Sequence, residues 1–262
     1  MAESEILEYY SVLRTNRDIF LLNQPDAFGA HETIHRTFGR IGRLLATTRD
    51  QRGSSHISLI PFILLMQRQA VAAFWSLASH QSYQAWVALR PCVESALIIG
   101  KWIEEPDNAR IWSEREHDRA AFKKAYEGKA LISSRLPRAS EIQGVLRTIN
   151  DDFMHTNTRY YSRHVEAAPG GPDHINLLLH YFDRDEREHR AHVLAFLHLS
   201  VVMQDSLCAM FASVFPPGAT INAGLSAFEE LFKPKTTDLL NRAPAVLPVL
   251  DELGLWGLSP AV

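Results

Sequence analysis

Residues 82–105 read SYQAWVALRPCVESALIIGKWIEE, and this stretch decides the fold. Apolar residues recur in it at steps of three and four, the repeat of a helix with one buried stripe, at Trp86, Leu89, Val93 and Leu97. Arg90 and Glu94 lie one helical turn apart beside that stripe, so their side chains can meet. Pro91 lies between them and removes one backbone hydrogen bond, which predicts a kink. We therefore expect a kinked, charge-bearing helix at the centre of a helical core.

The rest of the chain has the same helical period on both sides of this stretch. We predict further helices at about residues 4–23, 30–50, 58–79, 107–127, 139–155, 176–182 and 185–215. The first of these carries an apolar stripe that we expect to face inward, at Ile6, Leu7, Tyr10, Leu13, Ile19 and Leu22. No stretch alternates with the period of two that is typical of strands. The prediction is an all-α, multi-helix bundle of about eight to ten helices, with residues 1–215 as the bundle domain and residues 216–262 as a short helical appendage packed on it.

Composition sets limits on the class of protein. Of the 262 residues, 46% are hydrophobic and 22% are charged, and the net charge is −3, which is ordinary for a globular protein. An overall electrostatic attraction to DNA or to an anionic membrane is not expected, although a local basic patch is compatible with these values. The opening MAESEILEYY lacks the basic and apolar regions of a signal peptide, and Cys92 and Cys208 form no CxxC motif. We expect a cytoplasmic protein whose apolar runs at 57–78 and 193–215 are core helices.

Histidine is abundant, with 12 residues, and three Glu-x-x-His pairs place both side chains on one helical face. These pairs are Glu32/His35, Glu114/His117 and Glu186/His189. Two such pairs, together with single glutamates such as Glu94, could build a carboxylate-bridged metal site. Each pair lies in a charge-rich stretch that is typical of a solvated helix surface, and His189 and His192 lie near a helix start. We therefore predict no bound metal and no cofactor.

A second pattern is an arginine followed five positions later by a histidine, at Arg159/His164 and at Arg187/His192. Such a pair could cleave RNA without metal, because histidine moves a proton and arginine stabilises the charge on phosphorus. Asp151 and Asp152 precede His155 by four and three residues and could orient or charge its imidazole or bind a cation. The same residues fit a helix end with a capping histidine equally well.

Arg90 and Glu94 are interpreted first as a structural pair. A buried pair of this kind is costly to desolvate but fixes helix register. We expect it to tie several helices together and to meet His155 or the segment of Tyr160 and Tyr161. Arginines at 36, 40 and 43 share one helical face, which is most simply a solvated face.

Three segments carry a resemblance: ALRPCVESALIIGKWI, ARIWSEREHDRAAFKKAY and INDDFMHTNTRYYS. Over about residues 70–210 the chain resembles bacterial all-helical proteins of unassigned function that are similar to the HEPN superfamily, which includes ribonuclease toxins. The resemblance implies a helical bundle that often dimerises, with an arginine and a histidine separated by four to six intervening residues at the dimer cleft. Arg159 and His164 satisfy that spacing. Asn150 and His155 have the same gap but lack the arginine.

Three functions follow as expectations. The first is a HEPN-like, metal-independent ribonuclease or RNA-binding factor in stress or phage defence, acting as a homodimer through Arg159, His164 and His155. The second is a non-catalytic helical interaction or ligand-binding protein, with Arg90 and Glu94 in structural or binding roles. The third is a carboxylate/histidine metalloprotein.

Overall fold

The computed structural model describes residues 5–50, 53, 56–154, 164–171 and 174–215. Four of the predicted site residues, Arg159, His155, Tyr160 and Tyr161, lie outside these ranges. The predicted appendage at residues 216–262 lies outside them as well.

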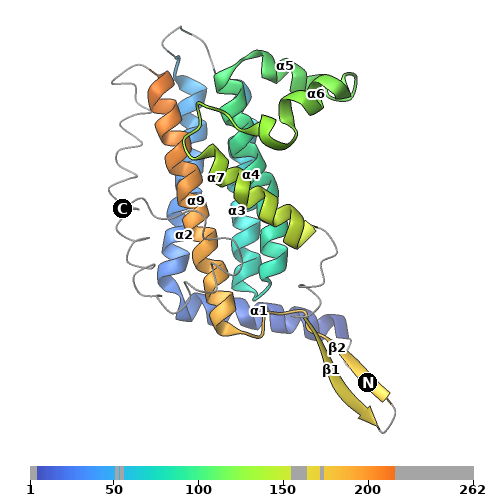
Figure 1. Ribbon diagram of the computed structural model, residues 1–262. Coiled ribbons are helices and arrows are strands. Elements are labelled where there is room, and N and C mark those ends of the chain that lie inside the picture. The colour runs from blue at the N-terminus through green and yellow to red at the C-terminus, as the bar shows by residue number, and fades with distance from the viewer. Residues whose placement is uncertain (1–4, 51–52, 54–55, 155–163, 172–173, 216–262) are drawn as a thin grey trace.

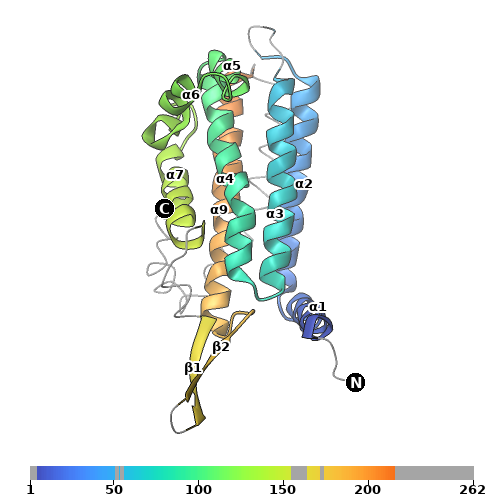
Figure 2. The same cartoon turned by 90° about the vertical axis from the view of Figure 1, so that its right-hand side faces the viewer.

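Four long helices lie side by side and form the body of the molecule (Figures 1 and 2). They are α2 (Pro25–Thr47), α3 (Ile60–Ala78), α4 (Ser82–Glu104) and α9 (Glu186–Val214). Shorter elements cover the sides and ends of this bundle: α1 (Glu5–Asn23), η1 (Ile57–Leu59), α5 (Asp107–Ser113), α6 (Arg119–Tyr126), η2 (Gly128–Leu131), α7 (Ala139–Thr148) and η3 (Ile149–Met154). The described residues thus include eight α-helices, at the low end of the expected range, and the all-α prediction is confirmed.

Helix α4 is central, as its sequence predicts. It packs against α3, α7, η3 and α9, and the side chains of its apolar stripe are no more than 1% exposed. The helix continues through Pro91 as one element, and the Ser95 hydroxyl donates a hydrogen bond to the Pro91 carbonyl at 2.7 Å. At Gly100 an added Cβ would lie 2.9 Å from the Leu136 Cβ, so the segment after η2 approaches α4 closely.

The expected inward stripe of α1 is wrong. Ile6, Leu7 and Tyr10 are more than 60% exposed and Leu22 is 80% exposed. The helix crosses one end of the bundle (Figure 1) and contacts it through another side than the predicted stripe. On that side Phe20 enters the core and Arg17 donates to the Ser79 hydroxyl at 2.7 Å. A helix that meets the end of a bundle has fewer neighbours than one lying along its side, so much of its apolar surface stays exposed.

Two other element predictions are corrected. The single helix expected at residues 107–127 is two helices, because the charged segment between them turns and the Asp118 side chain caps α6 by accepting from the Ala121 N–H at 2.9 Å. The helix expected at residues 176–182 is instead β2 (His174–Leu179), which pairs antiparallel with β1 (Val165–Gly171). This hairpin projects from the end of the bundle where α1 lies (Figures 1 and 2).

Within the described part of the chain, two segments are long and apolar enough to cross a membrane by length and composition alone, Ile57–Ala78 and α9. The most apolar window of α9 is 83% buried among the other helices, as in the core helix of a globular bundle, whereas that of Ile57–Ala78 is 33% buried. Both helices pack in the bundle. The cytoplasmic location stays a prediction.

Candidate functional site

Arg90, Glu94 and Asn150 form a polar group where α4 meets η3. Arg90 Nη1 donates to Glu94 Oε2 at 3.0 Å, and Arg90 Nε donates to Asn150 Oδ1 at 2.7 Å. The predicted Arg90–Glu94 pair therefore forms, and both side chains are 32% exposed, so the pair is half-buried rather than buried. Two partners fix the guanidinium in place, while its Nη2 has no hydrogen-bond partner in the described part of the chain.

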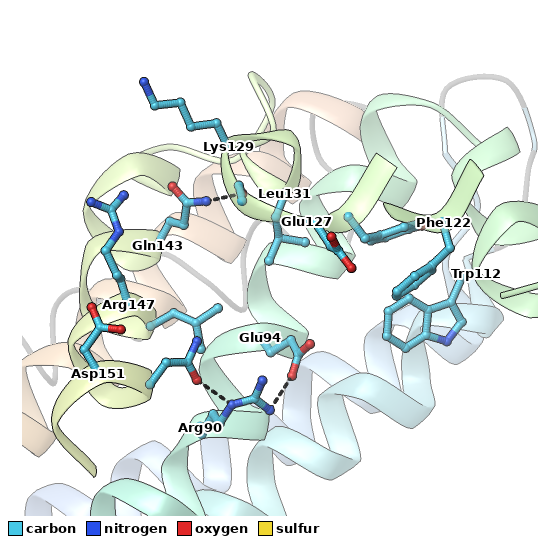
Figure 3. Close-up of a pocket in the computed structure, with 14 residues that line it drawn as sticks. Arg90, Glu94, Trp112, Phe122, Glu127, Lys129, Leu131, Gln143, Arg147 and Asp151 are labelled. Carbon is cyan, nitrogen blue, oxygen red and sulfur yellow. Dashed lines mark hydrogen bonds and ion pairs between the residues drawn. The ribbon is translucent and has the colours of Figure 1, made fainter. Parts of the chain in front are cut away.

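This polar group forms part of the wall of a cavity of about 400 Å³ between α4, α5, α6, η2, α7 and η3 (Figure 3). Its other walls include Trp112, Phe122, Tyr126, Glu127, Lys129, Leu131, Gln143, Arg147 and Asp151. A volume of this size lies within the range of small-molecule and cofactor pockets. The candidate binding residue Asp151 is thus placed here, while Asp152 follows it on η3 and is not among the lining residues.

One end of the cavity is aromatic. The Trp112 ring lies 5.6 Å from that of Phe122 and 5.2 Å from that of Tyr126, measured between centroids, and Phe122 and Tyr126 stack. The Tyr126 hydroxyl accepts from Trp102 Nε1 at 2.9 Å and donates to the Asn108 carbonyl. Burial raises the pKa of Tyr126 to about 12, so it is neutral at physiological pH and serves as a fixed wall.

The other end of the cavity carries two exposed cations. Lys129 and Arg147 are exposed, project from η2 and α7, and form no ion pair within the described ranges. In Figure 3 their side chains lie on the side of the cavity away from Trp112 and Phe122, with Glu94 between the two ends. The cavity is therefore polarised along its length. Its overall charge is balanced, because the three cations Arg90, Lys129 and Arg147 are matched by three carboxylates, Glu94, Glu127 and Asp151.

The π-helical turn η3 places Asn150 in this site. It follows directly on α7, and its wider turn changes the angular spacing of the side chains that follow. Turns of this kind recur at functional sites because they displace one residue from the regular helical pattern. Here Asn150 and Asp151 line the cavity, while Ile149 and Phe153 enter the core.

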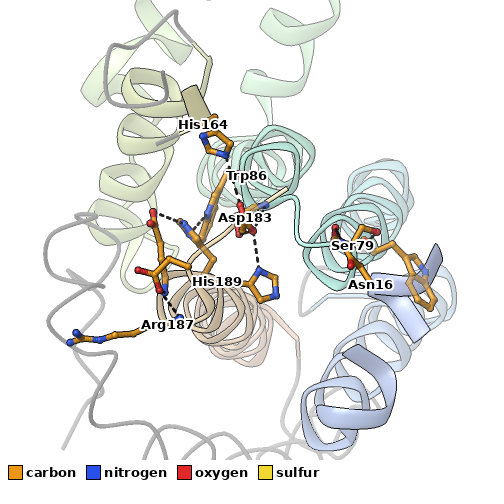
Figure 4. A network of polar contacts seen from close by, with 12 residues as sticks. Asn16, Ser79, Trp86, His164, Asp183, Arg187 and His189 are labelled. Carbon is orange, nitrogen blue, oxygen red and sulfur yellow. Dashed lines mark hydrogen bonds and ion pairs between the residues drawn. The ribbon is translucent and has the colours of Figure 1, made fainter. Parts of the chain in front are cut away.

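A second polar cluster is centred on Asp183, at the other end of α4 (Figure 4). Its Oδ2 accepts from the Ser82 N–H at 3.0 Å, from the Ser82 hydroxyl at 2.6 Å and from His189 Nδ1 at 2.9 Å. Burial alone would raise the pKa of Asp183, but the hydrogen bonds from His189 and Ser82 outweigh it, and the pKa lies below its usual value. Asp183 therefore stays ionised and satisfies the first N–H of α4.

The histidines around Asp183 are partly or wholly buried. His189 is 2% exposed and stacks on His80, with centroids 3.9 Å apart, and its Nε2 has no hydrogen-bond partner among the described residues. His192 accepts from Trp86 Nε1 at 2.9 Å. The expectation that His189 and His192 are solvent-accessible is wrong, because the side of α9 that carries them is buried, with Phe20 of α1 against His189 and Trp86 of α4 against His192. Burial, followed by the neighbouring His189, lowers the pKa of His80.

The structure places His164 apart from Arg90 and Glu94, whereas Arg159 and His155 lie outside the described residues. His164 Nε2 lies 3.9 Å from Asp183 Oδ1 and belongs to the Asp183 cluster, not to the cavity beside Arg90. In the described ranges no three metal-binding side chains come together, and Arg36, Arg40 and Arg43 form an exposed face, as expected. Sequence reasoning missed Asp183, His80 and Ser82, because the Asp183–Ser82 contact joins residues 101 positions apart.

Comparison with protein families, with curated proteins and with solved structures gives no match for this chain. The function is therefore argued from the geometry of the cavity.

Proposed function

We propose that this protein binds RNA, or another ligand carrying a nucleotide unit, in the cavity between α4 and α7. The observation that carries the proposal is the polarity of the cavity, with aromatic rings at one end and, at the other, exposed cations that form no ion pair with any described residue. Nucleotides combine a flat base with a phosphate several ångströms away. Aromatic side chains stack on bases and arginine or lysine holds phosphates, which are the two features of single-strand binding sites.

Each wall of the cavity has a role in this proposal. The base stacks against Trp112 or Phe122, and the phosphate is held by Lys129 and Arg147. Glu94 and Glu127 accept hydrogen bonds from base N–H groups, which would favour bases that present such donors. The overall neutral wall suits a ligand whose negative charge is confined to one end, and it agrees with a chain whose net charge is −3.

Ribonuclease activity is a second, separate proposal, because its described residue, His164, lies in the Asp183 cluster and not in the cavity. His164 Nε2 lies 3.9 Å from Asp183 Oδ1, within ion-pair distance of a carboxylate, which is the kind of neighbour that a histidine moving a proton can have. Arg159 and His155 are the other proposed catalytic residues and lie outside the described residues. Incubation of purified protein with total RNA in EDTA tests this step. We expect cleavage by the wild type and loss of cleavage in His164→Ala; equal cleavage by both would remove His164 from the mechanism.

Binding is tested separately, with a fluorescently labelled single-stranded RNA and with mononucleotides as competitors. Arg147→Glu and Lys129→Glu should each weaken binding about tenfold or more, and each should reduce the salt slope of log K by about 0.7, the value for one phosphate contact on a single strand. The matched control is Arg40→Glu, because Arg40 is an exposed arginine far along the chain on α2.

The outcomes distinguish the alternatives. Binding without cleavage supports a non-catalytic binding protein, and competition by mononucleotides supports a free nucleotide as the ligand. Equal weakening by Arg40→Glu would mean that charge alone, not the cavity, attracts RNA. No binding of any nucleotide by the wild type would refute the proposal.

A further inference from the structure

The hairpin β1–β2 has one wholly apolar face. Residues directly opposite in an antiparallel pair point to the same side of the sheet. Val165 pairs with Leu179, Ala167 with Leu177 and Pro169 with Ile175. These six side chains therefore share one face, which we call the hairpin face. The alternate pairs, Glu166 with Leu178 and Ala168 with Asn176, lie on the opposite side and include the polar residues.

Among the described residues, no helix packs extensively on the hairpin face. Ile175 is 74% exposed, Leu177 is 72% exposed and Leu179 is 51% exposed. The strands extend away from the bundle in both views (Figures 1 and 2). A two-stranded sheet alone is marginally stable in water, and an amphipathic sheet normally buries its apolar side. We therefore expect another surface to cover this exposed face.

The base of the hairpin fixes its direction. The His180 N–H donates to the His164 carbonyl at 2.7 Å, and Glu166 pairs with Arg184 and with His180 on the polar side. Tyr9 of α1 contacts the residues that follow β2, stacking on Phe182 at 5.5 Å and meeting Tyr181 edge-on at 5.6 Å. The hairpin is thus held as an arm on the end of the bundle rather than attached only by its two chain ends.

Apolar surface continues from the arm onto α1. Tyr181 is 63% exposed, and Tyr9 also contacts Tyr10, which is 61% exposed. One turn before Tyr10 lie Ile6 and Leu7, each 67% exposed. With on the order of 100 Å² for each fully exposed large apolar side chain, the seven named side chains of this surface and the hairpin face, which are 51% to 74% exposed, together offer about 500 Å². Apolar atoms contribute about 60% of the area of a typical interface. An apolar surface of about 500 Å² therefore corresponds to a contact of about 800 Å² per partner, the size of a standard specific interface.

We propose that the hairpin face is the contact surface for a second copy of this chain, which forms a two-fold dimer through the two arms. A two-fold contact brings a surface against itself, so it favours a surface without charges that would repel each other. The hairpin face carries no charged residue, and the nearby charges of Glu166 and Arg184 are paired on the other side. A membrane-binding surface would instead be expected to carry lysine or arginine around its apolar centre. None of the hairpin residues lines the cavity beside Arg90, so the dimer does not depend on nucleotide binding.

Sedimentation velocity of the full chain from about 1 to 100 μM tests the proposal. We expect a wild-type dimer and a dissociation constant at least about 100-fold higher in Leu177→Glu, because the two-fold axis introduces the charge twice into an apolar contact. The matched control is Asn176→Glu, one residue away on the polar face, which should dimerise as the wild type does. Because Leu177 is exposed, we expect the Leu177→Glu variant to fold as the wild type does. An unchanged circular dichroism spectrum checks this.

A second measurement locates the contact. The chain has 2 cysteines, Cys92 and Cys208, and both are buried. A Leu177→Cys variant therefore has one accessible thiol, and a short bismaleimide should link two copies faster than it links Asn176→Cys. A monomeric wild type at 100 μM, an equally tight dimer in Leu177→Glu, or sedimentation of the monomer with phosphatidylcholine and phosphatidylserine vesicles would each overturn the proposal.

Discussion

Replacing Asp183 by alanine should destabilise the protein more than any other single change outside the apolar core. The Asp183 side chain is 10% exposed and accepts hydrogen bonds from Ser82 and His189. Because Ser82 is the first residue of α4, this carboxylate caps the central helix from a segment 101 residues away. The substitution leaves the Ser82 N–H and His189 Nδ1 without their acceptor.

The size of the effect follows from these contacts. A hydrogen bond to a charged group contributes about 1.5–3 kcal/mol, and contacts that share one acceptor are not additive. We therefore expect Asp183→Ala to lower the free energy of unfolding by about 3–4 kcal/mol and Asp183→Asn by about half of that. Urea unfolding followed by circular dichroism measures both.

The matched control is Asp185→Ala. Asp185 caps α9 by accepting from the Arg187 and Glu188 N–H groups, but it is exposed and acts locally, so its loss should cost about 1 kcal/mol. The folded-state pKa of Asp183 is depressed, so its stabilisation is present above about pH 4 and is lost as pH falls through the folded pKa. An Asp183→Ala cost no larger than that of Asp185→Ala, or a cost that persists unchanged at acid pH, would refute the reasoning.

Three further predictions follow from packing and titration. Gly100→Ala should cost about 1–3 kcal/mol, because its Cβ would meet Leu136 at 2.9 Å, while Gly144→Ala, with nothing within 4 Å, should be neutral or stabilising in the same urea assay. Burial and then the neighbouring His35 lower the pKa of His31 to about 3, so stability should fall as pH drops from about 6.5 toward 3, by up to about 4–5 kcal/mol, and His31→Leu should flatten that part of the pH profile. Trp112→Ala should weaken RNA binding about tenfold in fluorescence polarisation while leaving the salt slope unchanged, because stacking on a base involves no phosphate.

The sequence predicts the central helix well because its evidence is local. The apolar period of α4 fixes which side is buried, and the four-residue step from Arg90 to Glu94 predicts their contact. The period of α1 likewise predicts a helix, but not which side meets the bundle, because that depends on where the helix crosses it.

The missed features depend on contacts between distant parts of the chain. Residues 174–179, HINLLL, alternate only in part because Leu178 interrupts the pattern, so the strand resembles a short apolar helix. The cavity arises where α5, α6, η2 and α7 pack beside α4, and no sequence motif predicts it. The sequence relates Asn150 only to His155, by a gap that lacks the arginine of the motif, whereas the structure pairs it with Arg90.

Photo-crosslinking tests the central claim, that the cavity between α4 and α7 binds a nucleotide, most directly. A single-stranded RNA carrying 4-thiouridine is irradiated with the protein, and the linked residues are identified by mass spectrometry. The account predicts crosslinks at Trp112, Phe122 or Tyr126, which are suppressed by excess unlabelled RNA. Crosslinks confined to the exposed arginine face of α2, or none at all under conditions where RNA binds, would contradict it.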